Sequence, residues 1–147
     1  MMLALLVLHV LAAATWVGGS AALVFVAVPA AVALPGPQRA ASLRRIATRW
    51  RPIGYGALFV LGLTGFLLGA YHHAWGDGLL RAKIVLGILL VGVSVAHDFV
   101  LGPRYATRRD TEAGQRLRPW LVGVGWLGFG LTILLPVLGV ILTSPLG

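Results

Sequence analysis

The chain has 147 residues, of which 59% are hydrophobic and 11% are charged, whereas a soluble domain carries about 25% charged residues. A water-soluble fold of this composition would have too little polar surface to cover itself. The net charge of +8 is compatible with nucleic-acid binding, but the arginines lie in short blocks beside long apolar runs. That pattern is typical of membrane topology, so no nucleic-acid partner is expected. The absence of cysteine excludes disulfides, thiolate metal sites and cysteine nucleophiles.

Long apolar stretches dominate the chain and decide its fold class. Each is long enough to cross a hydrocarbon core of about 30 Å, which takes roughly 20 helical residues. They cover residues 1–34, 52–71, 79–101 and 119–143. The first is interpreted as a span rather than a signal peptide, because it lacks a basic leading region and is too long. We therefore predict an all-α, integral membrane four-transmembrane-helix bundle that forms a single domain over residues 1–147.

The charged segments between the spans predict the orientation. The first and third connections are rich in arginine: Arg39, Arg44, Arg45, Arg49 and Arg51 in one, and Arg104, Arg108, Arg109, Arg116 and Arg118 in the other. The positive-inside rule places both in the cytoplasm. The connection from Tyr71 to Gly78 has no Lys or Arg, so it is expected outside with both termini, N-out and C-out. The expected location is the bacterial inner (cytoplasmic) membrane.

The basic segment after the first span has its own predicted structure. Pro35, Gly36 and Pro37 should end the first helix, and residues 39–50 then form a short basic amphipathic helix. Its apolar side chains Leu43, Ile46 and Trp50 share one side. We expect this interfacial helix to lie along the inner membrane surface.

Ionisable side chains at membrane depth are costly and mark candidate functional sites. Counting from Pro29, Pro52 and Pro103, one proline per span, predicts their depth. His9, His72 and Lys83 each lie about 20 residues from their marker, roughly 30 Å at the helical rise. His97 lies about 6 residues from Pro103, roughly 9 Å, so we expect it at the opposite end of the bundle from His9.

Helical spacing predicts which of these side chains face the interior. One stripe on the first span holds His9, Ala12, Ala13, Trp16 and Ser20, and one on the third holds Lys83, Gly87, Leu90, Ser94 and His97. Either His72 or His73 could turn inward on the second span. Simpler interpretations stay open: solvation of His72, His73 and Arg81, snorkelling of Lys83, and a helix-to-helix hydrogen bond from His9. Asp98 is expected to pair with Arg104 or Arg108 at the inner boundary.

Imidazole at membrane depth suggests metal or haem binding, because it is a common ligand of both. Two histidines at one height could hold a b-type haem, with His9 and either His72 or His73 as axial ligands. Lys83, Arg81 or an interfacial Arg would then pair with its propionates. Trp16 would be a further contact, although tryptophan at such a position is more often core filler. Cu(I) prefers sulfur ligands, but the only methionines are Met1 and Met2. The intramembrane glycines predict close helix packing and could also leave room for a planar cofactor.

Short motifs resemble a known group of membrane proteins. The run Leu8–Gly19, with His9 followed by Trp16-Val-Gly-Gly, looks like the opening helix of copper-resistance protein D (CopD) domains. Leu63-Thr64-Gly65 and Leu80-Arg81-Ala82-Lys83 match the same pattern, and the resemblance covers about residues 3–105. The skeleton is also similar to HemJ-type membrane protoporphyrinogen IX oxidases, small four-helix proteins associated with haem b. That resemblance implies functional roles for His9 and Lys83.

Three hypotheses follow for the function. The leading one is a haem-b-binding membrane oxidoreductase, active in electron transfer or haem-precursor oxidation, with an electron-transfer partner and with His9 and Lys83 as catalytic candidates. The alternative is a copper-binding or copper-uptake protein that captures the metal through His9, His72 and His73. The third is a structural subunit whose basic loops dock a cytoplasmic partner or anionic lipid. The glycine-rich helices would also allow a homodimer.

Overall fold

Helices make up nearly the whole structure, a computed structural model that describes residues 2–72 and 74–143 and contains no strand in them. Within these residues, four helical stretches are long and apolar enough to cross a membrane: Met2–Val32, Gly36–Tyr71, Gly78–Arg108 and Glu112–Leu142. The prediction of an all-α fold with four helices that could each span a membrane is confirmed. Large apolar side chains point outward along the stretches, with Leu3 72%, Phe59 70% and Val140 68% exposed. Such a surface suits contact with lipid rather than water.

We call the four helical stretches rods and number them in chain order. The first and second rods meet at the predicted proline boundary. α1 (Met2–Ala22), the π-helical turn η1 (Leu23–Ala27) and α2 (Val28–Val32) follow one another without a break. The next helix, α3, covers Gly36–Tyr71. The basic segment 39–50 is helical, as predicted, but it is the first part of α3 rather than a separate helix.

Packing explains why Pro52 does not end α3. Proline removes one backbone donor, a cost that neighbouring helices can offset in membrane proteins. The Trp50 ring packs against Gly19 of α1 and lies 6.1 Å from the Trp16 ring, measured between centroids. Trp50 therefore anchors this part of α3 to the first rod, where the sequence had predicted contact with the membrane surface.

The second half of the chain repeats the antiparallel arrangement. A 3-10 turn, η2 (Ala74–Gly76), leads to α4 (Gly78–Val95). Asp77 caps α4, because its Oδ1 accepts from the backbone N–H groups of Leu79 at 2.7 Å and Leu80 at 2.9 Å. The third rod continues through the π-helical η3 (Ala96–Leu101) into α5 (Gly102–Arg108). It thus extends beyond the predicted end at residue 101, and α6 (Glu112–Thr143) runs back beside it.

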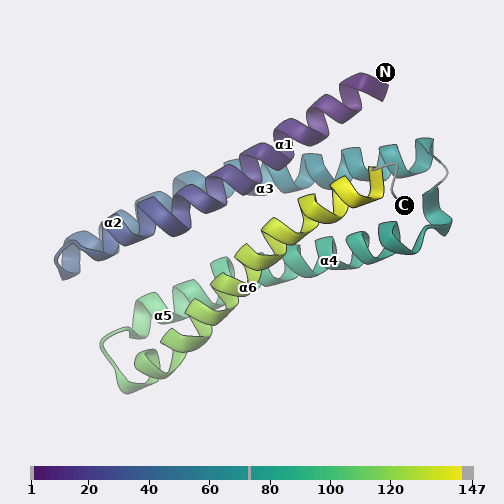
Figure 1. Cartoon of the computed structure of the whole chain (residues 1–147). Helices are drawn as coiled ribbons and strands as arrows, with labels where there is room; N and C mark the ends of the chain where they lie inside the picture. Colours follow the sequence, from purple (N-terminus) through teal and green to yellow (C-terminus); the bar gives the residue numbers. More distant parts are fainter. Residues whose placement is uncertain (1, 73, 144–147) are drawn as a thin grey trace.

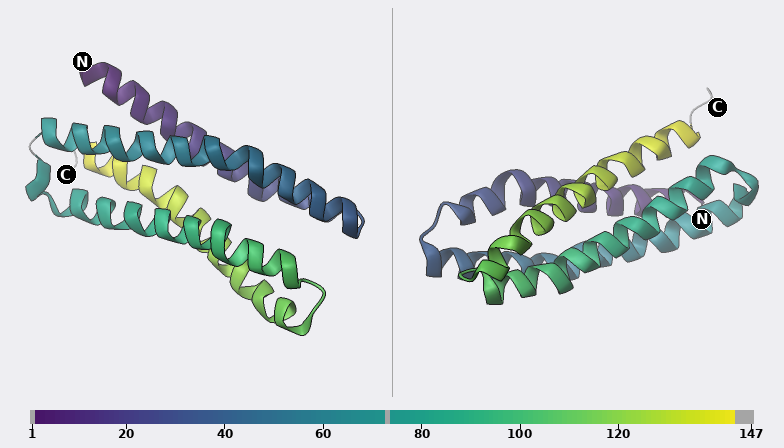
Figure 2. Two further views of the ribbon diagram at one scale, coloured as in Figure 1. Left: turned by 180° about the vertical axis from the view of Figure 1, so that it is seen from behind. Right: turned by 90° about the horizontal axis from the view of Figure 1, so that it is seen from below.

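The rods associate as two antiparallel pairs, α1 with α3 and α4 with α6 (Figures 1 and 2). The N-terminal end of α1, the α3–α4 connection and the far end of α6 lie together at one end (Figure 1). We call this the terminal end. Both arginine-rich connections lie at the other end, which we call the basic end. There the guanidinium of Arg109 donates to the carbonyl of Gly36 at 3.4 Å, joining the two connections.

Each rod contributes one residue to a small central core. Trp16, Ala57, Leu90 and Leu131 are buried together. Trp16 also donates its indole N–H to Thr132 Oγ1 at 3.0 Å. Both partners of this bond are more than nine-tenths buried, so it ties α1 to α6 at the centre of the molecule.

Candidate functional site

His9 of α1 is held by a hydrogen bond to α3. Its Nδ1 lies 2.8 Å from Thr64 Oγ1, and Thr64 is 3% exposed. The Thr64 hydroxyl donates its one proton to the carbonyl of Val60 at 2.6 Å. The hydroxyl must therefore accept from His9, which places the imidazole proton on Nδ1. Nε2 then carries the free lone pair, and it has no hydrogen-bond partner within residues 2–72 and 74–143.

Lys83 brings a second ionisable group into the same half of the bundle. It belongs to α4, and its Nζ reaches the backbone of α6, where a Cβ added at Gly139 would lie only 2.7 Å from it. His9 and Gly139 each lie seven residues from the hydrogen-bonded pair Trp16–Thr132, toward the terminal end, so Lys83 reaches α6 at about the level of His9. We call His9, Thr64 and Lys83 the His9 cluster. Its residues belong to the first three rods, and the Lys83 side chain also contacts the fourth rod at Gly139.

The predicted inward faces agree with the observed burial. On α1, Ala12 and Trp16 are buried and His9 is half-buried, and on the third rod the stripe from Lys83 to His97 includes the buried Leu90. Trp16, a predicted cofactor contact, lies in the core with its indole donor taken by Thr132.

The structure does not bring His72 to the level of His9. His9 lies beside Thr64, and His72 is eight residues further along α3, about 12 Å at the helical rise. His72 is exposed and its ring contacts Tyr71. Arg81 donates to the carbonyl of Gly76 at 2.7 Å, so it is engaged with the connection rather than with His9. His73 lies outside the described residues.

A second polar cluster joins α3 to η3 nearer the basic end. Asp98 accepts from the Tyr55 hydroxyl at 3.2 Å and lies 2.9 Å from Nδ1 of His97. Arg51 donates to the Asp98 backbone carbonyl at 2.5 Å. We call these four residues, with Phe99, the Asp98 cluster. The predicted ion pair between Asp98 and Arg104 or Arg108 is wrong, because Asp98 faces α3 instead.

Arg51, Tyr55 and Phe99 are the members of this cluster that sequence reasoning missed. The Arg51 guanidinium lies 4.7 Å from the centre of the Phe99 ring, an arrangement that favours a cation. Its Nε is buried without a hydrogen-bond partner. The signal for two of them was present in the four-residue spacing of Arg51 and Tyr55, which places both on one face of a helix. Their partner Asp98 could not be identified from spacing, because it lies on another rod.

The imidazole rings of His9 and His97 and the ammonium of Lys83 each lie against a glycine of a neighbouring helix. A Cβ at Gly65 would lie 3.3 Å from Cε1 of His9, and one at Gly125 would lie 3.4 Å from Nε2 of His97. Gly139 does the same for Lys83. These glycines therefore do more than let helices approach, because they seat the polar side chains between helices.

Comparisons of the chain with protein-family models, with curated proteins and with solved structures gave no match. The resemblance of its motifs to CopD domains and HemJ-type oxidases thus stays a prediction. Function has to be argued from the two clusters themselves.

Proposed function

We propose that the chain is a multi-pass inner-membrane protein that binds haem b through His9 and acts in electron transfer or haem-precursor oxidation. The observation that supports this most is the hydrogen bond from His9 Nδ1 to Thr64 Oγ1. A metal-ligating histidine commonly donates its second ring N–H to a neighbouring acceptor, which fixes the tautomer and the ring orientation. Thr64 provides that acceptor and leaves Nε2 of His9 with the lone pair that iron would need.

The number of ligands favours haem over copper. The porphyrin supplies four nitrogens to its iron, so one protein imidazole can hold it. A copper ion has no porphyrin and takes its protein ligands from side chains alone. The described residues, which leave out His73, contain no group of three His, Cys, Asp or Glu that could hold a metal ion. His72, the expected second ligand, is separated from His9 by about 12 Å along α3. The geometry therefore supports haem with His9 alone as the protein ligand.

Each residue of the His9 cluster has a role in this proposal. His9 holds the iron, Thr64 orients His9, and Gly65 clears the space beside the imidazole. Lys83 supplies a cation for a propionate carboxylate and a proton donor near the reaction centre. Bound haem would supply reversible one-electron chemistry. The orientation proposed with this function places the basic end in the cytoplasm.

Optical spectra of the protein purified after haem-replete expression test the proposal. The oxidised and reduced spectra should show a Soret band that His9→Ala abolishes. Thr64→Val should weaken haem binding about 10- to 100-fold, the usual effect of losing such a neighbour. His97→Ala is the matched control, since His97 also sits against a glycine and has a hydrogen-bonded Nδ1. A colourless protein, or a band lost in His97→Ala but kept in His9→Ala, would contradict the proposal.

A further inference from the structure

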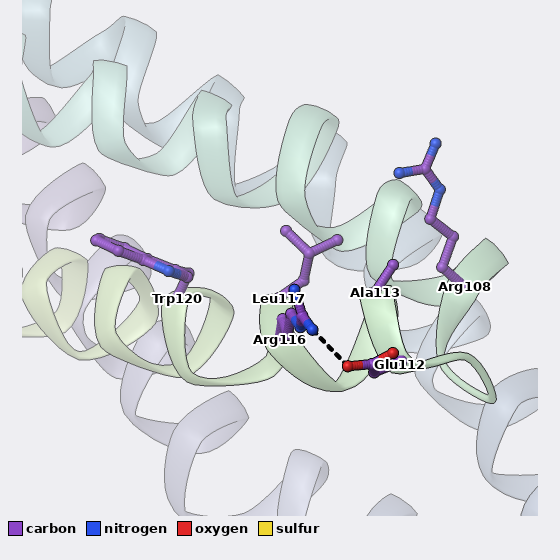
Figure 3. A pocket seen from close by; sticks show the side chains of 6 residues that line it. All are labelled: Arg108, Glu112, Ala113, Arg116, Leu117 and Trp120. Carbon is purple, nitrogen blue, oxygen red and sulfur yellow. Dashed lines mark hydrogen bonds and ion pairs between the residues drawn. The ribbon is translucent and has the colours of Figure 1, made fainter.

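A hollow of about 460 Å³ lies at the basic end, where α5 meets α6. It is lined by Arg108, Glu112, Ala113, Arg116, Leu117 and Trp120. Figure 3 shows Arg108 toward one end of it and Trp120 toward the other, with Leu117 and Ala113 between them. This α5–α6 pocket shares no residue with either cluster described above.

The charged side of the pocket favours an anion. Arg108 has no hydrogen-bond or ion-pair partner for its guanidinium among the described residues, so it is available to a ligand. Arg116 forms an ion pair with Glu112, one turn away on α6 (Figure 3). Both side chains of that pair are about four-fifths exposed, and such surface pairs contribute little and exchange readily. The lining thus holds two guanidinium groups and one carboxylate, and arginine is suited to binding phosphate through paired donors.

The apolar side of the pocket favours a lipid over a free ion. Ala113, Leu117 and Trp120 recur at spacings of four and three, so they share one face of α6. The hydrophobic part of α6 begins at Pro119, and Trp120 is 69% exposed at that boundary. Tryptophan at such a boundary is typical of the headgroup level of a membrane. The pocket therefore offers a phosphate site that continues directly into an apolar surface.

We infer that the α5–α6 pocket binds the phosphodiester headgroup of an anionic phospholipid. Arg108 and Arg116 contact the phosphate, and an acyl chain runs past Leu117 and Trp120. Glu112 competes with the phosphate for Arg116. This inference is independent of haem binding, and it holds whether or not His9 carries a cofactor.

Native mass spectrometry of the detergent-purified full chain, titrated with phosphatidylglycerol, tests the inference. Arg108→Gln with Arg116→Gln should weaken binding by about fivefold for each arginine. Arg44→Gln with Arg49→Gln removes the same charge from exposed positions of α3 and should change binding little. Glu112→Gln should strengthen binding because it frees Arg116, whereas Asp110→Asn, the same charge change two residues away in the connection, should not. A gain in binding cannot arise from a variant that fails to fold.

Two further ligands separate the alternatives. Phosphatidylcholine should bind at least tenfold more weakly than phosphatidylglycerol, and millimolar inorganic phosphate should fail to displace the lipid. Equal binding of the two lipids would overturn the inference, as would displacement by inorganic phosphate. Equal losses in the Arg44/Arg49 and Arg108/Arg116 variants would also overturn it, because they would show attraction to overall charge rather than a site.

Discussion

One hydroxyl group determines which nitrogen of His9 can react. The Thr64 hydroxyl has a single proton, and the carbonyl of Val60 takes it at 2.6 Å. His9 therefore faces an acceptor and must carry its own proton on Nδ1. The same interhelical bond was one of the simpler interpretations of His9 from sequence. It is compatible with ligand binding, because it occupies one ring nitrogen and leaves the other free.

Replacing Thr64 should remove the preference of His9 for the tautomer that is protonated on Nδ1. Nitrogen-15 NMR of the histidine side chains in cofactor-free protein should show His9 protonated on Nδ1. Thr64→Val removes the acceptor, so the spectrum should shift toward a mixture that includes the Nε2–H form. Thr64→Ser keeps the hydroxyl and should retain the wild-type signal. An unchanged His9 signal in Thr64→Val would show that the hydrogen bond does not select the tautomer.

The helix faces could be predicted from sequence, but the relative heights of the helices could not. The stripe from Lys83 to His97 faces inward because helical period alone determines the face. Heights were counted from prolines taken as membrane boundaries, and Pro52 lies inside α3 rather than at its end. The contact between Gly19 and Trp50 shows that Pro52 is level with about residue 18 of the first rod, not with Pro29. His9 therefore lies beside Thr64 rather than His72.

The contact between Gly19 and Trp50 sets the relative height of α1 and α3, and one added methyl group at Gly19 should disturb it. A Cβ at Gly19 would overlap the Trp50 ring, so Gly19→Ala should destabilise the protein by about 1–3 kcal/mol. Gly18→Ala is the control, because a Cβ there meets nothing within 4 Å, and it should be neutral or slightly stabilising. Unfolding in detergent measures both. Adding Trp50→Leu to Gly19→Ala should recover part of the loss, and a Gly19→Ala protein as stable as the wild type would contradict the packing.

The π-helical turn η3 explains why the partner of Asp98 was not predicted. π-helical turns have more residues per turn than an α-helix and often occur at functional sites. Within η3, Asp98 and Phe99 contact α3 while the His97 ring lies against Gly125 of α6. One short element thus joins two neighbouring rods. Sequence reasoning paired Asp98 with Arg104 or Arg108 at the inner boundary, and spacing along one helix cannot reveal a partner on another rod.

Asp98→Asn tests whether the Asp98 cluster is structural. The substitution removes the negative charge and leaves one acceptor oxygen for both Tyr55 and His97. Unfolding measurements should show a loss of about 1–3 kcal/mol, the usual cost of an unsatisfied partner. Asp110→Asn is the control, because the Asp110 side chain is 87% exposed and surface pairs contribute little. A stable Asp98→Asn protein that loses haem binding would instead link this cluster to the His9 cluster.

At the scale of the whole molecule, the charges divide between the two ends. The arginine-rich connections share the basic end, and the α3–α4 connection lies with the N-terminal end of α1 at the other (Figure 1). This division is what the hydropathy and arginine pattern predicted, because alternating spans must place alternate connections on the same side. The two polar clusters lie between these ends, with Tyr55 about 14 Å from Thr64 along α3. From the positive-inside rule we propose that the basic end faces the cytoplasm.

The lack of cysteine makes that orientation directly measurable, because a single introduced thiol is the only one in the chain. Gly76→Cys places it in the α3–α4 connection, and Gln38→Cys places it near the start of α3, with both positions exposed. A membrane-impermeant maleimide added to intact spheroplasts should label Gly76→Cys. Gln38→Cys should react only after the membrane is opened, because moving five nearby arginines across a membrane is unfavourable. The reverse labelling pattern would show the opposite orientation, with the α5–α6 pocket at the outer leaflet.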